Sequence, residues 1–121
     1  MAVILIVEDD PFIRESAELM IQDWGHRTFS ASDVDEALLF VRSQQHIDAL
    51  FTDIYLKKRV HGGCELAYEA TELRPRLRVL YTTGNSITDK MKGLFVKGAE
   101  FLSKPYTPHQ LHDSVEHLLT A

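Results

Sequence analysis

The stretch that decides the fold is Ala2-Val3-Ile4-Leu5-Ile6-Val7-Glu8-Asp9-Asp10-Pro11, an apolar run that ends in three acids and a proline. Residues 2–7 are apolar at odd and even positions alike, which is typical of a central parallel strand covered on both faces. Pro11 suits the first turn of a helix, and apolar residues recur at helical spacing from Phe12 to Trp24. The stretch therefore predicts a strand that leads directly into a helix.

The same strand-helix unit recurs along the rest of the chain. Further strands are predicted at Arg27–Ala31, Ala49–Thr52, Arg78–Thr82 and Glu100–Ser103. Helices are predicted after Ser32 or Asp33, from Leu66 to a point before Pro75, over Ser86–Val96, and from Thr107-Pro108 onward. Five such units with right-handed crossovers predict an α/β fold, a doubly wound, flavodoxin-like, five-stranded parallel sheet with helices on both faces. The helix over Ser86–Val96 is the weakest, because an interior glycine such as Gly93 costs about 1 kcal/mol relative to alanine.

Composition limits the classes of protein that fit. The chain has 121 residues, of which 45% are hydrophobic and 26% charged, so we expect a single domain over residues 1–121. A net charge of −5 provides no general attraction to nucleic acid or anionic lipid. Cys64 is the single cysteine, no signal peptide is evident, and no apolar run reaches the ~20 residues of a membrane span. We expect a cytoplasmic protein that binds neither nucleic acid nor membranes.

Polar residues follow the predicted strands, where the carboxyl ends of a parallel sheet meet at one edge. They are Glu8, Asp9 and Asp10 after the first strand, Asp53 after the third, Thr82 and Thr83 after the fourth, and Lys104 after the fifth. Carboxylates gathered in one pocket repel each other unless a cation or protons compensate. Asp9 and Asp53 are therefore candidate ligands of a hard cation such as Mg²⁺.

Each of these residues also has an ordinary structural interpretation. Asp53 alone could cap a helix, residues 8–10 could be a capping cluster, Thr83 could belong to a turn, and Lys104 could be an exposed lysine. Their coincidence at one edge favours a site instead. An aspartate, a metal pocket, a hydroxyl and an ammonium together support phosphoryl transfer through an aspartyl-phosphate.

These residues resemble, over essentially the whole chain, the receiver domain of bacterial two-component response regulators. Ile6 to Pro11 is similar to the acidic motif, Asp53 to the phosphoacceptor, Thr83-Gly84 to the switch hydroxyl with its small neighbour, and Lys104-Pro105 to the phosphate-binding lysine with its proline. The resemblance implies that Asp9 and Asp53 coordinate Mg²⁺ or Mn²⁺ directly, Glu8 through water, and Tyr55 through its backbone carbonyl. It also implies a cis Lys104–Pro105 bond and a switch aromatic at Phe101.

The function implied by the resemblance is a phosphorylation-controlled switch. A sensor histidine kinase would donate the phosphoryl group, and the protein would catalyse only its own phosphorylation and dephosphorylation. Thr83 would then move inward and Phe101 would rotate, so that a downstream protein reads the surface of the fourth helix, fifth strand and fifth helix. We expect a monomer or weak dimer without an output domain. A phosphorelay intermediate, a phosphate sink and a receiver excised from a hybrid histidine kinase are alternatives.

Two further classes of function stay open. A small Mg²⁺-dependent phosphohydrolase would need an additional general acid and a substrate cap, and an interaction module independent of phosphorylation would leave the pocket unused. Phe101 could be a core aromatic that never moves.

The loop after Asp53 departs from the family pattern. Lys57 replaces the usual proline, and the loop from Lys57 to Gly63 is one or two residues longer than usual. Its cations Lys57, Lys58 and Arg59 could attract a phosphodonor or kinase surface, or form a solvated charge run.

Overall fold

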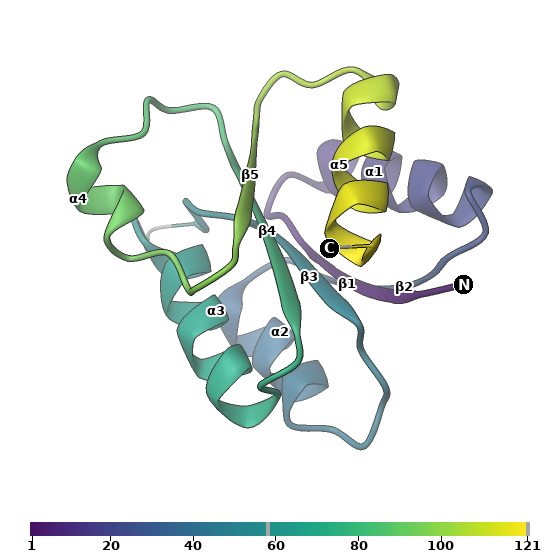
Figure 1. The fold of residues 1–121 in the computed structure, drawn as a ribbon, viewed down its shortest axis with the longest axis horizontal. Coiled ribbons are helices and arrows are strands. Elements are labelled where there is room, and N and C mark those ends of the chain that lie inside the picture. The colour runs from purple at the N-terminus through teal and green to yellow at the C-terminus, as the bar shows by residue number, and fades with distance from the viewer. Residues whose placement is uncertain (58, 121) are drawn as a thin grey trace.

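The computed structural model describes residues 1–57 and 59–120, which form alternating strands and helices (Figure 1). The strands are β1 (Val3–Val7), β2 (Arg27–Ala31), β3 (Ala49–Asp53), β4 (Arg78–Thr83) and β5 (Glu100–Ser103). The helices are α1 (Pro11–Asp23), α2 (Val34–Val41), α3 (Gly62–Leu73), α4 (Asp89–Lys92) and α5 (Pro108–Thr120). All strand pairs are parallel, in the order β2-β1-β3-β4-β5, which confirms the predicted doubly wound sheet. None of the helices in the described residues is long and apolar enough to cross a membrane.

Helices cover the sheet on both sides, with α1 and α5 on one face and α2 and α3 on the other (Figure 1). The alternation of β1 accounts for this arrangement. Ile4 and Ile6 pack with α1 and α5, whereas Leu5 and Val7 pack with α2 and α3. Every residue of β1 and β3 is buried. The apolar pattern at both parities of residues 2–7 is therefore explained by two separate cores.

Local capping fixes where the first two helices begin. The Asp10 carboxylate accepts hydrogen bonds from the N–H groups of Phe12 and Ile13, and Pro11 occupies the first turn of α1. Asp33 caps α2 by accepting a hydrogen bond from the Glu36 N–H at 2.8 Å. The acidic run after β1 thus divides its roles, because Asp10 satisfies free amides of the helix and leaves Glu8 and Asp9 for the sheet edge.

The helix predicted over Ser86–Val96 was wrong in extent, because α4 is a single turn that ends at Gly93. Two tertiary contacts tie the residues that follow α4 to β4. The Val96 N–H donates a hydrogen bond to the Tyr81 hydroxyl at 3.1 Å, and the Phe95 ring packs on Tyr81 with centroids 4.4 Å apart. The amides of Gly93, Leu94 and Phe95 still donate to carbonyls three or four residues earlier, so the regular helix gives way to turns before Val96 bonds to β4.

Candidate functional site

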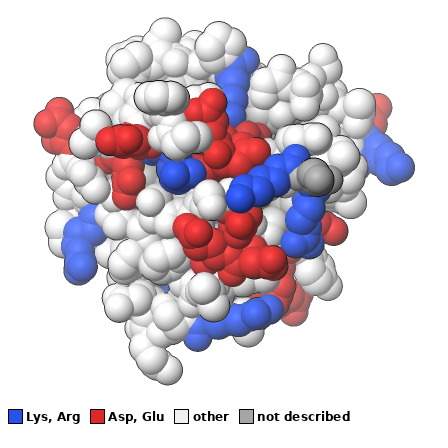
Figure 2. Space-filling model, turned by 180° about the vertical axis from the view of Figure 1, so that it is seen from behind, with Lys and Arg blue, Asp and Glu red and all other residues white. Residues whose placement is uncertain are grey.

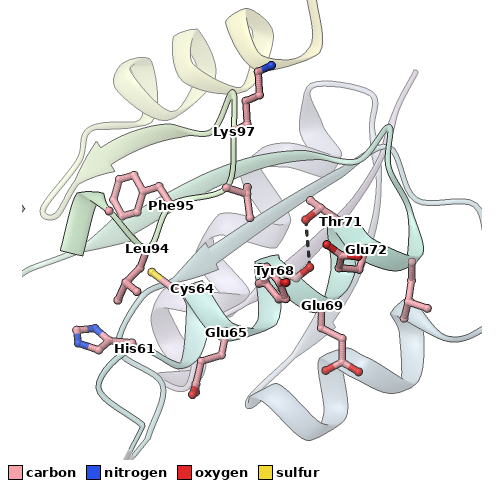
Figure 3. A pocket seen from close by; sticks show the side chains of 13 residues that line it. His61, Cys64, Glu65, Tyr68, Glu69, Thr71, Glu72, Leu94, Phe95 and Lys97 are labelled. Carbon is pink, nitrogen blue, oxygen red and sulfur yellow. Dashed lines mark hydrogen bonds between the residues drawn. The ribbon is translucent and has the colours of Figure 1, made fainter. Parts of the chain in front are cut away.

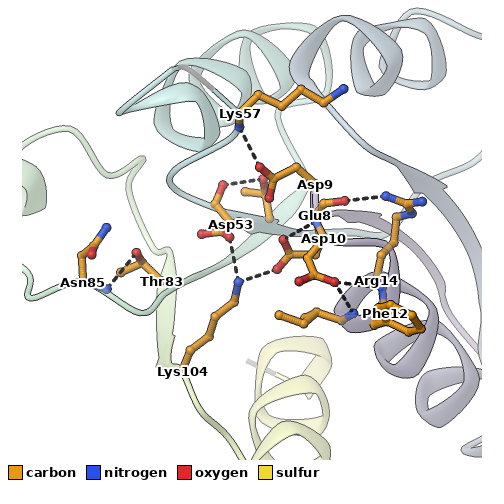
Figure 4. Close-up of polar contacts among 12 residues, drawn as sticks. Glu8, Asp9, Asp10, Phe12, Arg14, Asp53, Lys57, Thr83, Asn85 and Lys104 are labelled. Carbon is orange, nitrogen blue, oxygen red and sulfur yellow. Dashed lines mark hydrogen bonds and ion pairs between the residues drawn. The ribbon is translucent and has the colours of Figure 1, made fainter.

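Three carboxylates meet where β1 and β3 end (Figure 4). Val7 pairs with Thr52 in the sheet, so Glu8 and Asp9 follow β1 beside Asp53, the last residue of β3. One carboxylate oxygen from each of the three lies within 4.8 Å of the others. Glu8 and Asp53 are only 5% and 6% exposed. The sheet edge therefore holds a compact and largely buried acidic cluster.

Lys104, which follows β5, reaches into this cluster. Its Nζ donates to Asp53 Oδ2 at 2.7 Å and also forms an ion pair with Glu8. The Lys104–Pro105 peptide bond is cis. Burial disfavours the charged lysine, but its hydrogen bonds to Asp53 and Glu8 outweigh burial and raise its pKa. The ammonium is thus fixed in its charged form against the carboxylate of Asp53.

The three acids differ in how readily they ionise. Burial raises the pKa of Glu8 and of Asp53, although the Lys104 ammonium acts against it in both cases. Burial also opposes ionisation of Asp9, yet hydrogen bonds with Glu8 and the Lys57 amide outweigh it and lower the Asp9 pKa. One lysine does not fully compensate the negative charge of the pocket. Additional positive charge would favour the ionised forms of Glu8 and Asp53.

The long loop after β3 contacts Asp9 through a backbone amide. Leu56 and Arg59 exchange two backbone hydrogen bonds, and Lys57 adopts a left-handed φ of 53°. In this conformation the Lys57 N–H donates to Asp9 Oδ2 at 3.0 Å. The Lys57 ammonium lies 3.5 Å from Asp33 and the Arg59 guanidinium 3.1 Å from Glu65, so both described cations of the run are paired. Lys58 lies outside the described residues.

The beginning of α3 touches the backbone of Asp53. A Cβ added to Gly63 would lie 2.0 Å from the Asp53 carbonyl oxygen, so a glycine is required there. The Gly63 N–H donates to the Ile54 carbonyl at 2.8 Å. Tyr55 exposes its side chain, and its amide is among the groups that favour ionised Asp53. The main chain after Asp53 is therefore closely packed against α3, while the Tyr55 side chain is exposed to solvent.

Comparison with known proteins identifies the family. Residues 4–116 match the family model of the response regulator receiver domain. The chain belongs to this receiver family.

Individual relatives agree with that family. Response regulator Rre1 of Synechocystis sp. is 30% identical over 119 residues, which cover 96% of this chain and 51% of that protein. A response regulator receiver protein from Sinorhizobium medicae has a TM-score of 0.89 at 27% identity, covering 99% of this chain and 95% of that one. The receiver domain of the hybrid histidine kinase CckA has a TM-score of 0.81 at 25% identity, and the match covers 97% of this chain and 98% of that one. The chain spans about half the length of the curated relatives it matches.

In this receiver domain, Thr83 and Phe101 lie apart from the acidic cluster. Thr83 is buried at the end of β4, and its hydroxyl accepts a hydrogen bond from the Asn85 N–H at 3.2 Å (Figure 4). Phe101 is half-buried beside Tyr81 in the sheet register, and its ring stacks on Phe95 with centroids 6.3 Å apart. The side chains of Glu8, Asp9, Asp53 and Lys104 therefore gather in one cluster, whereas Thr83 meets it only through its carbonyl, which accepts from the Lys104 N–H at 3.0 Å, and Phe101 lies on β5.

Sequence reasoning missed three groups that shape the receiver site. Arg14 of α1 donates from its guanidinium to the Glu8 carbonyl at 2.9 Å, the Lys57 amide holds Asp9, and Gly63 allows α3 to approach Asp53. Gly62-Gly63 was a signal in the sequence, but it was interpreted only as the end of a loop. The Arg14 contact has a weaker signal, a cation one helical turn after the Asp10 cap.

Proposed function

We propose that this receiver domain is a cytoplasmic switch in which Asp53 accepts a phosphoryl group from a sensor histidine kinase in an Mg²⁺-dependent reaction. The observation that carries the proposal is the buried cluster of Glu8, Asp9 and Asp53 with the Lys104 ammonium 2.7 Å from Asp53 Oδ2. Residues with those roles are the minimum that transfer to a carboxylate requires, namely a nucleophile, a cation pocket and a fixed positive charge. The protein would thus catalyse only its own phosphorylation and dephosphorylation.

The residues of the cluster fit Mg²⁺ or Mn²⁺. Carboxylate and carbonyl oxygens are the ligands that hard cations prefer, and the three carboxylates are close enough to share one ion. Asp9 and Asp53 would bind it directly, Glu8 through water, and Tyr55 through its backbone carbonyl. The bound ion would supply positive charge to the oxygens of the transferring phosphoryl group.

The chain's own residues would carry out the transfer. An Asp53 carboxylate oxygen forms the new P–O bond while the P–N bond to the donor histidine breaks, and the departing imidazole nitrogen takes up a proton. The Lys104 ammonium, already on Asp53, stabilises charge on the phosphoryl oxygens. Thr83 would leave the Asn85 amide so that its hydroxyl can donate to the same group.

The response would pass from Thr83 to Phe101 and then to the surface of α4, β5 and α5, where a downstream protein binds. Phe101 stacks on Phe95, so rotation of its ring would also displace residues 93–97. A change from mostly inactive to mostly active requires phosphorylation to favour the active state by roughly 5 kcal/mol. The similarity to the CckA receiver supports one variant of the proposal, in which the domain serves within a hybrid kinase or phosphorelay, and a phosphate sink remains the other.

Acetyl phosphate labelling followed by mass spectrometry tests the phosphoacceptor. Wild type is expected to gain a phosphoryl group on Asp53 with Mg²⁺ and not with EDTA, whereas Asp53→Asn is expected to gain none. Asp9→Asn should need much more Mg²⁺. Asp10→Asn is the matched control, because Asp10 caps α1 and asparagine also caps helices. Equal labelling of wild type and Asp53→Asn would disprove the proposal.

Hydrogen exchange on the same samples tests the switch. Phosphorylated wild type is expected to change its amide protection over residues 89–103, while Asp53→Asn treated in the same way is not. Unchanged amide protection in labelled wild type would disprove the conformational switch and leave the assignment of Asp53 as phosphoacceptor intact.

A further inference from the structure

A groove of about 980 Å³ lies between α3 and residues 93–97, away from the acidic cluster (Figure 3). Its lining is largely apolar, with Cys64, Tyr68 and Leu73 from α3 facing Leu94, Phe95 and Val96. None of these side chains takes part in the proposed phosphoryl transfer. The groove is therefore a second surface feature of the domain, lined by residues other than those of the acidic cluster.

The groove exists because α4 is short. Residues 93–97 follow its single turn as an irregular segment, and Phe95 turns inward to Tyr81. The outer face of α3 is left partly uncovered, with Tyr68 65% and Leu73 53% exposed, and Leu94 on the opposite side of the groove is 42% exposed. Large apolar side chains gathered at one exposed depression are typical of a protein interaction site.

Charge indicates what kind of partner fits. Glu65, Glu69 and Glu72 recur every third or fourth residue along α3 and line the same groove, against Lys97 on the other side (Figure 3). Glu65 and Glu69 pair with Arg59 and Arg42, but all four side chains are exposed. Exposed pairs of this kind contribute little net energy, so a partner's cations can replace them. The apolar groove thus has one rim of three glutamates, two of them in exposed ion pairs that a partner's cations can replace.

We propose that this groove binds a basic amphipathic helix of a partner protein. α3 has 12 residues and is therefore about 18 Å long, which matches three to four turns of a helix lying alongside it. Apolar side chains of that helix, spaced three and four residues apart, would fill the space between Tyr68 and Leu94. Its lysines or arginines would lie over the glutamates. This goes beyond the proposed function, since the unphosphorylated domain already has the groove.

Fluorescence anisotropy with a designed helical peptide tests the proposal. The probe is a labelled peptide of about four turns with leucines on one face and lysines beside them, and the matched probe carries glutamates in place of the lysines. The basic probe is expected to bind the full chain, and the acidic one to bind at least about tenfold more weakly. Amide chemical shifts should change along α3 and residues 93–97.

Substitutions in the groove should weaken binding of the basic probe. Leu94→Asp and Glu72→Lys are each expected to cost about tenfold in affinity. Leu39→Asp on α2 and Glu15→Lys on α1 are matched controls, because both residues are exposed and outside the groove. Labelling of Asp53 by acetyl phosphate should equal wild type in all four variants, which reports that each is folded.

Three results would overturn the groove assignment, namely equal binding of both probes, wild-type affinity in the groove variants, or shifts confined to other surfaces. Failure of Asp53 labelling together with intact probe binding would instead refute the phosphoacceptor and leave the groove in place.

Discussion

Two parts of the molecule, here called its halves, differ in how tightly they are packed, namely β1 and β3 with α3, and β5 with α4 and the residues after it. β1 and β3 are buried at every residue, whereas β5 is half-buried to exposed and the four described residues of α4 include no buried one. The carboxylates belong to the first half and Phe101 and Lys104 to the second, while Thr83 is buried at the end of β4 between them. Segments with few buried contacts open at low free energy. Under the proposed function, the phosphoryl group would be received on the tightly packed half and its effect would be expressed on the looser one.

The largest effect is expected when one glycine in each half is replaced by alanine. Gly63→Ala would place a Cβ 2.0 Å from the Asp53 carbonyl oxygen, and we expect it to lower the free energy of unfolding by at least about 3 kcal/mol. Gly93 has a φ of −64°, and an added Cβ there would meet its nearest atom at 3.4 Å. Gly93→Ala should therefore be neutral or stabilising by about 0.4–1 kcal/mol.

Urea denaturation measures both free energies. A comparable loss in the two variants would contradict the difference between the halves.

An intermediate effect is expected from removing one charge in the tightly packed half. Burial raises the pKa of Asp53, so the folded protein binds this proton more tightly than the unfolded chain. Stability should then fall as pH rises from the unfolded through the folded pKa, and the full cost is present above both. In EDTA at neutral pH, Asp53→Asn should be more stable than wild type by on the order of 1 kcal/mol. The gain should vanish in acid.

Thermal unfolding across pH, with and without Mg²⁺, checks this prediction. Mg²⁺ should stabilise wild type more than Asp53→Asn, because the variant lacks one carboxylate of the cluster. A variant that is less stable than wild type in EDTA would mean that the Lys104 contact outweighs burial.

The smallest effect compares two helix caps. Asp33 caps α2, which packs in the core, and Thr88 caps α4 by accepting from the Met91 N–H at 3.1 Å. Asp33→Ala should cost about 1 kcal/mol of global stability. Thr88→Ala should cost less than about 0.5 kcal/mol globally, because α4 buries little, yet it should speed amide exchange over residues 89–93. Similar global losses would show that α4 is as well integrated as α2.

Sequence reasoning was most successful where the signal is local. The continuous apolar run at residues 2–7, the proline after Asp10 and the placement of four polar motifs after strands were sufficient for the doubly wound parallel sheet and for the convergence of Glu8, Asp9, Asp53 and Lys104. Each of these depends on residues near one another in the chain, together with general rules for parallel sheets.

It was least successful where distant contacts decide the geometry. Val96 leaves the predicted helix because it bonds to Tyr81, fifteen residues earlier in the chain. The Asp9 carboxylate accepts a hydrogen bond from the backbone amide of Lys57, and a backbone contact of this kind leaves no pattern of residue types in the sequence. The assignments of Asp53, Thr83 and Phe101 to chemical roles remain predictions for the experiments above.

The close contact at Gly63 gives Asp53 a direct neighbour in α3 as well as in β4. Because the amino end of α3 rests on the carbonyl of Asp53 itself, any displacement of that peptide unit must move the helix or strain it. The same helix forms one wall of the groove and carries its glutamates. A shift of the Asp53 peptide unit would therefore be passed through the main chain to one wall of the groove.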